Sequence, residues 1–384
     1  MKIVKLGDVC KIIAGQSPPS STYNNEGDGL PFFQGKADFG YLYPKVRVWC
    51  SKPKKVAEVG DILISVRAPV GPTNVCDTKS CIGRGLSAIR TGNDLNSDFL
   101  LFYLRFIEDK LSQTGSGSTF KAITQNDLKA IDVPLPSLEE QRKIVKLLNQ
   151  ADLLRQKRKQ AIDLLDEYLK SVFFDMFGDL ISNPKGWDMK KLSQIMISGP
   201  QNGLYRPSSD YGLEGTPILR IDSFYDGKIA SLKSLKRLVI PENIKLLYQL
   251  ENGDIVINRV NSPSHLGKSA LIVNLEEPTV FESNMMRFSI NQNFFNTVFL
   301  IKVLQTQFIK KQILKRAKDA VNQSSINQED VKSFIVPQPP LELQIKFAGQ
   351  VREAEKTKEN MITQSEELDK QFQALMQESF RPDV

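Results

Sequence analysis

A segment beginning at Lys121 recurs 203 residues further along the chain, and this internal repeat limits the possible folds more than any other feature. The first copy, residues 121–141, reads KAITQNDLKAIDVPLPSLEEQ, and the second, residues 324–344, reads SSINQEDVKSFIVPQPPLELQ. Earlier in the chain, GDILISVR at 60–67 is echoed by GDIVINR at 253–259. The offset between matching pieces drifts from 186 to 203 residues, as expected when insertions accumulate in surface loops. The chain is therefore predicted to contain two copies of one unit.

Each copy combines a globular block with a long helical segment in the same order. The globular blocks contain short β-like runs broken by Gly, Pro, Asn and Asp, which is typical of small sheets joined by loops. A Pro-x-Pro segment follows, and the stretch after it has no interior proline. The sequence therefore predicts an α+β fold with two similar, loop-rich α/β domains, residues 1–136 and 181–338, separated by two long helices within residues 137–180 and 339–384.

Seam residues in both helical segments recur at alternating spacings of four and three, which is the pattern of a coiled coil. A solitary helix of this length with an apolar stripe would be unstable in water, so we expect the two segments to pair. The globular block between them favours an antiparallel coiled coil. We interpret the charged seam positions Arg155, Arg158 and Lys358 as fixing the register or contacting another subunit. The other predicted seam residues are Ile144, Leu148, Ala151, Ile162, Leu165, Leu169, Val172, Phe347, Val351, Ala354, Met361, Leu368, Phe372 and Leu375.

Positive charge is concentrated in the two globular blocks. The formal net charge of the chain is +7; residues 1–136 carry +4 and residues 181–338 carry +6, whereas residues 137–180 are neutral and residues 339–384 carry −3. Two basic domains on a stiff spacer favour a bivalent reader of a long anionic polymer, since a second reader at a fixed distance adds avidity. About 40 helical residues make a rod of roughly 60 Å. We therefore expect a gap of at most roughly 17 base pairs between two DNA half-sites.

No residue pattern predicts a catalytic, metal or cofactor site. The single histidine, His265, has no metal-ligand or triad partner nearby in the sequence. Gly83–Gly85 and Gly115–Gly117 match pieces of a dinucleotide-binding fingerprint but lack its βαβ frame. No Walker A sequence is present, and Asn183-Pro184 continues as Lys-Gly, unlike the Asn-Pro-Pro-aromatic motif of adenine methyltransferases. We therefore predict a chain that is not itself an enzyme and holds no cofactor or metal.

Cysteine usage and hydropathy predict a cytoplasmic protein. The cysteines are few and confined to the first block, which favours reduced thiols over a disulfide framework; they are Cys10, Cys50, Cys76 and Cys81. The first residues contain no apolar stretch like that of a signal peptide. No run of about 18 apolar residues exists, so we expect no membrane-spanning segment.

Several stretches of the chain resemble one protein family. The most specific is PLPSLEEQRKIVKLL at 134–148, which continues through ADLLRQKR at 151–158, LLDEYLKS at 164–171 and DMFG at 175–178. Weaker matches are GDILISVR, NPKGW at 183–187 and NRVNSP at 258–263. Together they resemble the specificity (S) subunits of type I restriction–modification systems, over essentially the whole chain and in duplicate. The second copy departs from the pattern, because PLELQIKFA at 340–348 lacks the Glu-Gln-Arg-Lys-Ile core of the first.

This resemblance implies a function and partners. Each globular block would be a target-recognition domain that reads one half of a split site in double-stranded DNA, and the helices would fix the spacing between the halves. The helices would also dock modification (methyltransferase) subunits, two of them expected, and the assembly would recruit restriction (endonuclease and translocase) subunits. Methylation and cleavage would then reside in the partners.

Polar and basic loop residues are the candidates for DNA contact, because Arg, Lys, Asn, Gln, Ser and Thr read bases and bind phosphates. In the first domain we select Gln16, Ser17, Gln34, Lys36, Arg67, Arg84, Ser116, Ser118, Thr119 and Lys121. In the second we select Asn202, Tyr205, Arg220, Arg259, Asn261, Ser264, His265, Lys268, Asn322, Gln323 and Ser324. Arg67 and Arg259 rank highest, since both follow a strand in the repeated motif. Any of these could also be an ordinary solvated loop residue.

Two other functions remain open from the sequence. One is a self-contained DNA methyltransferase with its own recognition domain, which the missing cofactor and catalytic motifs disfavour. The other is a coiled-coil scaffold without a nucleic-acid role, which the positive charge of the globular blocks disfavours.

Overall fold

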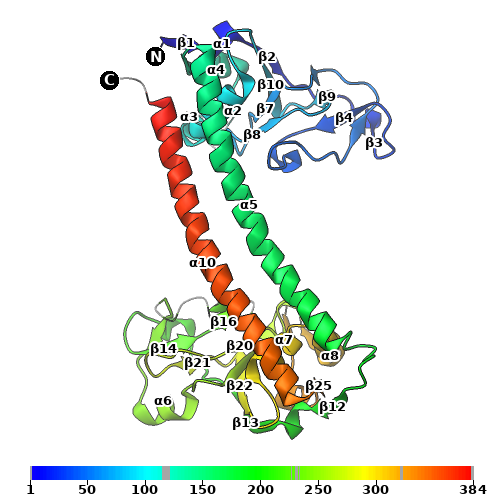
Figure 1. The fold of residues 1–384 in the computed structure, drawn as a ribbon, viewed down its shortest axis with the longest axis vertical. Helices are drawn as coiled ribbons and strands as arrows, with labels where there is room; N and C mark the ends of the chain where they lie inside the picture. The colour runs from blue at the N-terminus through cyan, green and yellow to red at the C-terminus, as the bar shows by residue number, and fades with distance from the viewer. Residues whose placement is uncertain are drawn as a thin grey trace. The chain divides into compact units, whose positions relative to one another are not determined.

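The computed structural model describes residues 2–114, 122–225, 227–229, 232, 234–320 and 323–381. The chain forms two compact units (Figure 1). Unit 1 comprises Met1–Ala161 and Met361–Val384, and unit 2 comprises Ile162–Asn360. Each unit therefore contains one globular block, one half of the first long helix and one half of the second.

Unit 1 is built on a four-stranded antiparallel sheet and a five-stranded mixed sheet. The first has the order β2-β10-β7-β8, with β2 at Cys10–Ala14, β10 at Leu86–Thr91, β7 at Ile62–Ser65 and β8 at Thr73–Val75. The second has the order β3-β5-β4-β9-β6, with β3 at Tyr23–Asn24, β5 at Trp49–Cys50, β4 at Leu30–Phe33, β9 at Ser80–Ile82 and β6 at Val56–Ala57. A separate pair joins β1 (Lys2–Lys5) to β11 (Asp132–Leu135). The helices of this block are α1 (Leu6–Val9), α2 (Ser97–Phe106), α3 (Glu108–Thr114) and α4 (Gln125–Lys129), with short 3₁₀ turns η1 (Ser20–Thr22) and η2 (Lys36–Asp38).

Unit 2 repeats this plan. Its antiparallel sheet has the order β13-β22-β18-β20, with β13 at Met196–Asn202, β22 at Met285–Ile290, β18 at Ile255–Asn258 and β20 at Ser269–Leu271. A second sheet has the order β17-β14-β21, with β17 at Arg237–Leu238, β14 at Thr216–Leu219 and β21 at Val280–Phe281. The remaining strands are β12 (Asp188–Lys191) with β25 (Ile335–Gln338), β15 (Phe224–Tyr225) with β16 (Lys228–Ile229), and β24 (Gln323–Ser325) between β19 (Val260–Asn261) and β23 (Lys318–Ala320). The helices are α6 (Glu242–Tyr248), α7 (Thr297–Leu304), α8 (Gln307–Arg316) and α9 (Gln328–Lys332), with 3₁₀ turns η3 (Leu192–Gln194) and η4 (Ser208–Asp210).

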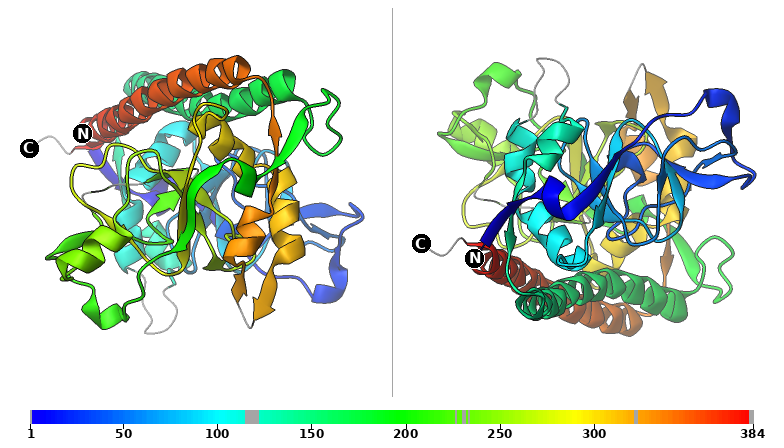
Figure 2. Two further views of the ribbon diagram at one scale, coloured as in Figure 1. Left: turned by 90° about the horizontal axis from the view of Figure 1, so that it is seen from below. Right: turned by 90° about the horizontal axis from the view of Figure 1, so that it is seen from above.

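The two globular blocks share more than their element order. Each contains one short parallel strand pair, β4 with β9 in unit 1 and β14 with β21 in unit 2. Strands distant in sequence pair within each sheet, as β2 does with β10 in unit 1 and β13 with β22 in unit 2. Figure 2 gives two further views of the ribbon. The predicted duplication of an α+β domain is therefore confirmed at the level of strand order and direction.

A buried glutamine fastens each long helix to its own block. Gln141 accepts a hydrogen bond from the Asn96 backbone N–H at 2.7 Å, and its amide donates to the Asp94 and Pro136 carbonyls. Gln344 makes the same contacts with the Asn296 N–H and the Phe294 and Pro339 carbonyls. Both glutamines are fully buried. Asn96 and Asn296 in turn cap α2 and α7, so the helix start and the block form one hydrogen-bonded joint.

The two long helices are α5 (Leu138–Phe177) and α10 (Leu341–Phe380), each 40 residues long. Ser137 caps α5, because its hydroxyl accepts from the Glu140 N–H while the Glu140 carboxylate accepts from the Ser137 N–H. Gly178, with a φ of +76°, ends the helix in the left-handed conformation that glycine adopts without strain. The two helices form the predicted antiparallel coiled coil. In unit 2 the helix contacts run from Asp166 with Lys358 to Phe177 with Phe347.

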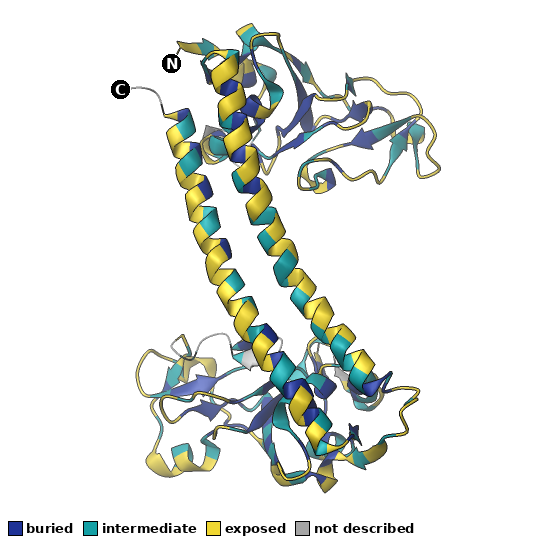
Figure 3. Cartoon of the chain, viewed as in Figure 1, coloured by how far each residue is buried: buried dark blue, intermediate teal, exposed yellow. Residues whose placement is uncertain are grey.

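All predicted seam positions lie at least half-buried. In unit 1, Leu148 and Phe372 belong to the same hydrophobic core as α2; in unit 2, Phe347 and Val351 pack with Phe177 and α7. Figure 3 shows buried and intermediate positions recurring along both helices between exposed ones. The alternating spacing in the sequence therefore marks the buried face of each helix.

Two of the three charged seam positions, Arg155 and Lys358, are paired in a reciprocal manner. Arg155 of α5 donates to Asp369 of α10 at 2.6 Å, and Lys358 of α10 donates to Asp166 of α5 at 2.7 Å. The offset of 203 residues relates Arg155 to Lys358 and Asp166 to Asp369. Each pair thus repeats the other with the helices exchanged, which supports the predicted role of these positions in setting register.

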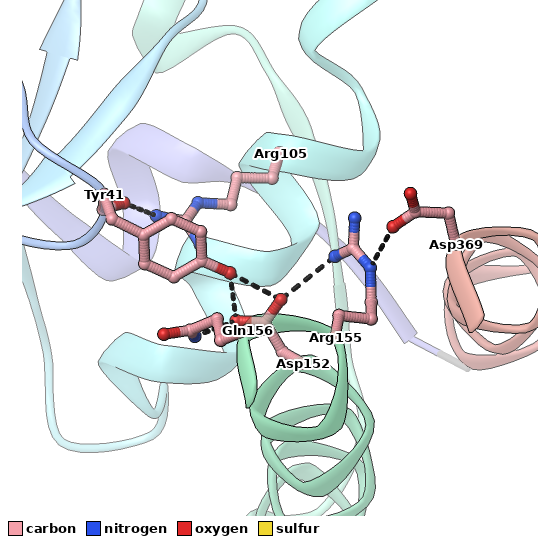
Figure 4. A network of polar contacts seen from close by, with 6 residues as sticks. All are labelled: Tyr41, Arg105, Asp152, Arg155, Gln156 and Asp369. Carbon is pink, nitrogen blue, oxygen red and sulfur yellow. Dashed lines mark hydrogen bonds and ion pairs between the residues drawn. The ribbon is translucent and has the colours of Figure 1, made fainter. Parts of the chain in front are cut away.

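Figure 4 shows how unit 1 extends this pairing into its globular block. Asp152 accepts from Arg155 at 3.0 Å and from the Tyr41 hydroxyl at 2.6 Å, and Arg105 of α2 donates to the Tyr41 carbonyl. Burial, together with the bond to Asp152, raises the pKa of Tyr41 to about 12. The loop carrying Tyr41 is therefore tied to α5 by a polar network and α5 to α10 by the Arg155–Asp369 pair.

Candidate nucleic-acid interface

A polar pocket of about 190 Å³ lies in unit 1 where several strands end. Its lining includes five of the six described residues that the sequence predicted for DNA contact in this domain: Ser17, Gln34, Lys36, Arg67 and Arg84. The sixth, Gln16, is exposed next to Ser17. Ser65, Ala68, Gly35 and Gly85 complete the lining and were not predicted.

Strand geometry explains why these side chains converge. Strands β4 and β9 are parallel and end in register at Phe33 and Ile82, so Gln34 and the turn that carries Arg84 leave the same edge of the sheet. The chain passes close to itself here, since a Cβ atom on Gly85 would lie 2.2 Å from the Gln34 carbonyl oxygen. Gly85 therefore permits the close approach that forms one wall of the pocket.

The pocket has a positive electrostatic character. Its described lining residues include three cationic side chains, Lys36, Arg67 and Arg84, and no carboxylate. Within the described part of the chain, none of these three side chains forms an ion pair or a side-chain hydrogen bond. The nearby carboxylate of Asp38 is already engaged by Arg47 and by the Gln34 backbone N–H. The three cations are therefore available to an anionic ligand.

The corresponding place in unit 2 holds different chemistry. Strands β14 and β21 end at Leu219 and Phe281, so Arg220 takes the position of Gln34, and Glu282 takes the position of Gly83. Glu282 lies 3.5 Å from Arg220 Nε and accepts the Ile221 N–H. Burial raises the pKa of Glu282, partly opposed by these two contacts. In unit 2, therefore, the Arg220 side chain is paired with the buried carboxylate of Glu282.

Arg67 and Arg259 do not occupy equivalent positions. The Val66 carbonyl accepts from Ile123 N–H, and the Arg259 carbonyl accepts from Ile326 N–H in the same way. Arg259 therefore matches Val66, and Val260 matches Arg67. Arg259 is half-buried and donates to the Ser283 carbonyl at 3.0 Å, whereas Arg67 is exposed.

Asn258 is a buried polar residue that the sequence did not single out. It matches Ser65 on the pocket of unit 1, it is fully buried, and neither atom of its amide has a partner among the residues the structure describes. The sequence signal is a polar residue closing an otherwise apolar strand, Ile255-Val-Ile-Asn258.

The remaining predicted residues of unit 2 are dispersed. His265 is exposed and lies 2.9 Å from the Ser264 hydroxyl, in a turn whose carbonyls accept from Lys310. Lys268 lies over the Phe224 ring, with its ammonium nitrogen 5.0 Å from the centroid. Tyr205 is 75% exposed at the position that matches Ser17. Asn202 and Gln323 are exposed, Asn261 is half-buried and Ser324 is buried.

Five predicted residues fall outside the described part of the chain. They are Ser116, Ser118, Thr119, Lys121 and Asn322.

An apolar groove of about 620 Å³ lies within unit 2. It runs along the end of α5 beside α8, and its lining includes Leu169, Phe173, Phe174, Ile181, Phe308 and Phe347. Phe174 is 61% exposed and Ile181 is 53% exposed. Exposed apolar side chains that gather on one surface are typical of protein-binding sites.

The described residues offer little for metal or thiol chemistry. Among residues 2–114, 122–225, 227–229, 232, 234–320 and 323–381, no group of three or more His, Cys, Asp and Glu side chains could hold a metal ion. The four cysteines are free thiols. Burial raises the pKa of Cys10 to about 12 and those of Cys76 and Cys81 to about 11, so these thiols stay protonated near neutral pH. No helix in the described regions is long and apolar enough to cross a lipid bilayer.

Comparison with known proteins identifies a family. The sequence model of the type I restriction modification DNA specificity domain matches residues 1–164 and again residues 184–368. A putative type I restriction enzyme MjaX specificity subunit from Methanocaldococcus jannaschii is 50% identical over 163 residues, which is 41% of this chain and 38% of that protein. The MjaVIII specificity subunit of the same organism is 22% identical over 395 residues, covering 98% of this chain and 91% of the relative.

A solved structure shares the fold over the full length. The type I restriction–modification S subunit from M. genitalium has a TM-score of 0.60 with this chain, at 16% sequence identity, and the match covers 100% of this chain and 96% of that one. At this identity the likeness concerns the fold alone.

Proposed function

Because the chain belongs to the family of type I restriction–modification DNA specificity subunits, we propose that it selects a bipartite site in double-stranded DNA. Residues 1–136 would read one half of the site and residues 181–338 the other. The observation that carries this proposal is the duplication of one sheet plan in a single chain, each copy followed by a 40-residue helix. A duplicated reader suits a target with two halves.

The helices would fix the distance between the two halves. A helix of 40 residues measures about 60 Å, or the rise of roughly 17 base pairs of B-DNA. The reciprocal pairs Arg155–Asp369 and Lys358–Asp166 support a single register for the two helices. Sliding one helix against the other would break both pairs.

We further propose that the chain itself is non-catalytic and docks modification subunits, two per chain, through its helices, with restriction subunits joining the assembly. The apolar groove beside Phe174 supports one docking site. Replacing Phe174 with Ser should reduce the amount of modification subunit that co-purifies with the chain, because one of the two docking sites is lost, while leaving the fold intact, since Phe174 is largely exposed. Leu246→Ser is the matched control, since Leu246 is 65% exposed on α6 and does not line the groove. Equal co-purification of both variants would contradict this site.

The recognition function is tested by mapping methylated bases. The chain is expressed with its modification subunit in a host that lacks both, and the genome is sequenced for base methylation. A split motif that appears only when the chain is present is the expected result. Methylation that is independent of the chain, or that follows an undivided motif, would contradict the proposal.

A further inference from the structure

We infer that the pocket of unit 1 is an anchor for one DNA phosphate and that unit 2 has no equivalent anchor. The inference rests on the proposed DNA-binding function and assigns to Lys36, Arg67 and Arg84 a role different from base reading. It follows from the size of the pocket, its charge and its comparison with unit 2.

The shape of the pocket favours a phosphate over a base. Sites for drug-sized molecules are typically about 300 Å³ or larger, and this pocket measures about 190 Å³. Base edges are read by side chains that project into a groove of the duplex. A concave site instead receives a group that projects from the nucleic acid, and the phosphate oxygens of the backbone are such a group.

The chemistry of the lining fits the same ligand. Arginine guanidinium groups bind phosphate oxygens through paired, charge-assisted hydrogen bonds. Arg67 and Arg84 come from two separate strand ends, Lys36 adds a third cation, and the neutral side chains of Ser17 and Gln34 can donate further hydrogen bonds. Among the lining residues that the structure describes, no carboxylate competes for these donors.

Unit 2 lacks each of these cations at the matching position. The backbone bonds from Gln16 to Ile82 and from Leu204 to Phe281 are equivalent, and they align Arg84 with Ser283. The ends of the parallel strands align Lys36 with Asp222. The equivalent hydrogen bonds to the Val66 and Arg259 carbonyls align Arg67 with Val260. Two arginines lie near this place in unit 2: Arg220 is paired with Glu282, and Arg259 donates to the Ser283 carbonyl. The phosphate anchor therefore belongs to one recognition domain only.

The test measures how binding of the full-length chain to a mixed-sequence DNA duplex depends on salt. Each phosphate contact contributes a slope of roughly 0.9 to the plot of log affinity against log salt concentration. Because the pocket holds one phosphate, the double variant Arg67→Ala/Arg84→Ala should lower the slope by about this amount and weaken binding roughly five- to tenfold near 0.1 M salt. Arg67→Ala and Arg84→Ala alone should each lower the slope by part of this amount. Arg84→Lys should retain most of the slope because it keeps the charge. Lys79→Ala is the control, since Lys79 is exposed in the same unit but pairs with Glu58 outside the pocket.

The same variants are then examined for their methylation motif in the presence of the modification subunit. A phosphate anchor predicts an unchanged motif with reduced methylation efficiency. An unchanged salt slope in the double variant would overturn the inference while leaving DNA binding intact. A relaxed motif in one half-site would overturn it in favour of base reading. If the unaltered chain bound DNA without any salt dependence, the proposed function itself would fail.

Discussion

The globular blocks of unit 1 and unit 2 agree where the chain is packed and differ where its strands end. They share a four-stranded sheet order, a parallel strand pair, a buried glutamine near the start of the long helix and an asparagine that caps α2 or α7. At the ends of the parallel strand pair, unit 1 has three cationic side chains around a pocket that form no ion pair with any residue the structure describes, whereas unit 2 has the Arg220–Glu282 ion pair.

This difference shows which positions are constrained by burial and hydrogen bonding and which are free to vary. A change at a buried joint leaves polar groups without partners and costs stability. A change at an exposed strand end costs little, so these positions are free to acquire different chemistry. Two copies of one frame can therefore carry two different recognition surfaces.

The shared joint predicts the largest effect of substitution. Gln141→Leu and Gln344→Leu each leave a buried N–H and two carbonyls without a side-chain partner, so each should destabilise its own unit by about 3 kcal/mol. Native-state hydrogen exchange measures this for each unit separately. Gln150→Leu, on the exposed face of α5, is the control and should cost little. Strongly unequal costs at the two joints would break the equivalence of the units.

The helix seam predicts an intermediate and unequal effect. Arg155 pairs with Asp152 and Asp369, and its guanidinium carbon lies 4.3 Å from the centroid of the Phe372 ring, whereas the equivalent Lys358 pairs with Asp166. Arg155→Ala should therefore cost about 2 kcal/mol and Lys358→Ala about 0.5 kcal/mol, because the lysine is the more exposed of the two.

Urea unfolding of both variants, beside the exposed-site variant Lys157→Ala, checks this order. If Lys358→Ala were the more destabilised of the two, the contacts of unit 2 would contribute more than those of unit 1 to fixing the register of the helices.

The smallest expected effect is a difference in pH dependence. Burial raises the pKa of Asp254 in unit 2, so the folded state favours its protonated form. Its stabilising contribution is present below the ordinary pKa of aspartate and is lost as the pH rises through the folded value. Asp254→Asn should therefore cost less near pH 7 than near pH 4.

Asp127 of unit 1 should show the opposite pH dependence of stability. Hydrogen bonds from the Thr124 backbone N–H and hydroxyl lower the pKa of Asp127, so its contribution is present above the ordinary value and is lost as the pH falls. Asp127→Asn should cost more near pH 7 than at a pH well below the ordinary aspartate value of about 3.9. Urea unfolding of both variants across this range checks the two signs, and parallel trends would contradict the assignment.

The duplicated domains and the two long helices could be predicted from the sequence because both leave periodic signals in it. The duplicated motif and the four-three spacing are periodic signals, and periodicity is fixed by helix and strand geometry. The two segments after Pro136 and Pro339 are long helices, and their seam positions lie at least half-buried. The family resemblance and the fold class are likewise confirmed.

The site could be predicted only in part. Residue type alone selected Arg67, Arg84 and Lys36, and the structure brings them together in one pocket. Residue type favoured Arg67 and Arg259 equally, although aligning GDILISVR with GDIVINR already places Arg259 opposite Val66, and the backbone hydrogen bonds from Ile123 and Ile326 confirm that register. The hydrogen bond from Tyr41 to Asp152 joins residues that are 111 positions apart, and no local sequence pattern predicts it.

The most direct test of the account is to shorten both helices together and determine the DNA site that is then methylated. Deleting residues 159–165 and 359–365 removes one heptad from α5 and one from α10 while retaining Arg155–Asp369 and Lys358–Asp166. Seven helical residues correspond to about 10 Å, or roughly three base pairs. The account predicts that both half-site sequences persist with a gap shortened by about that number. Methylation of the original motif with its original gap would contradict it.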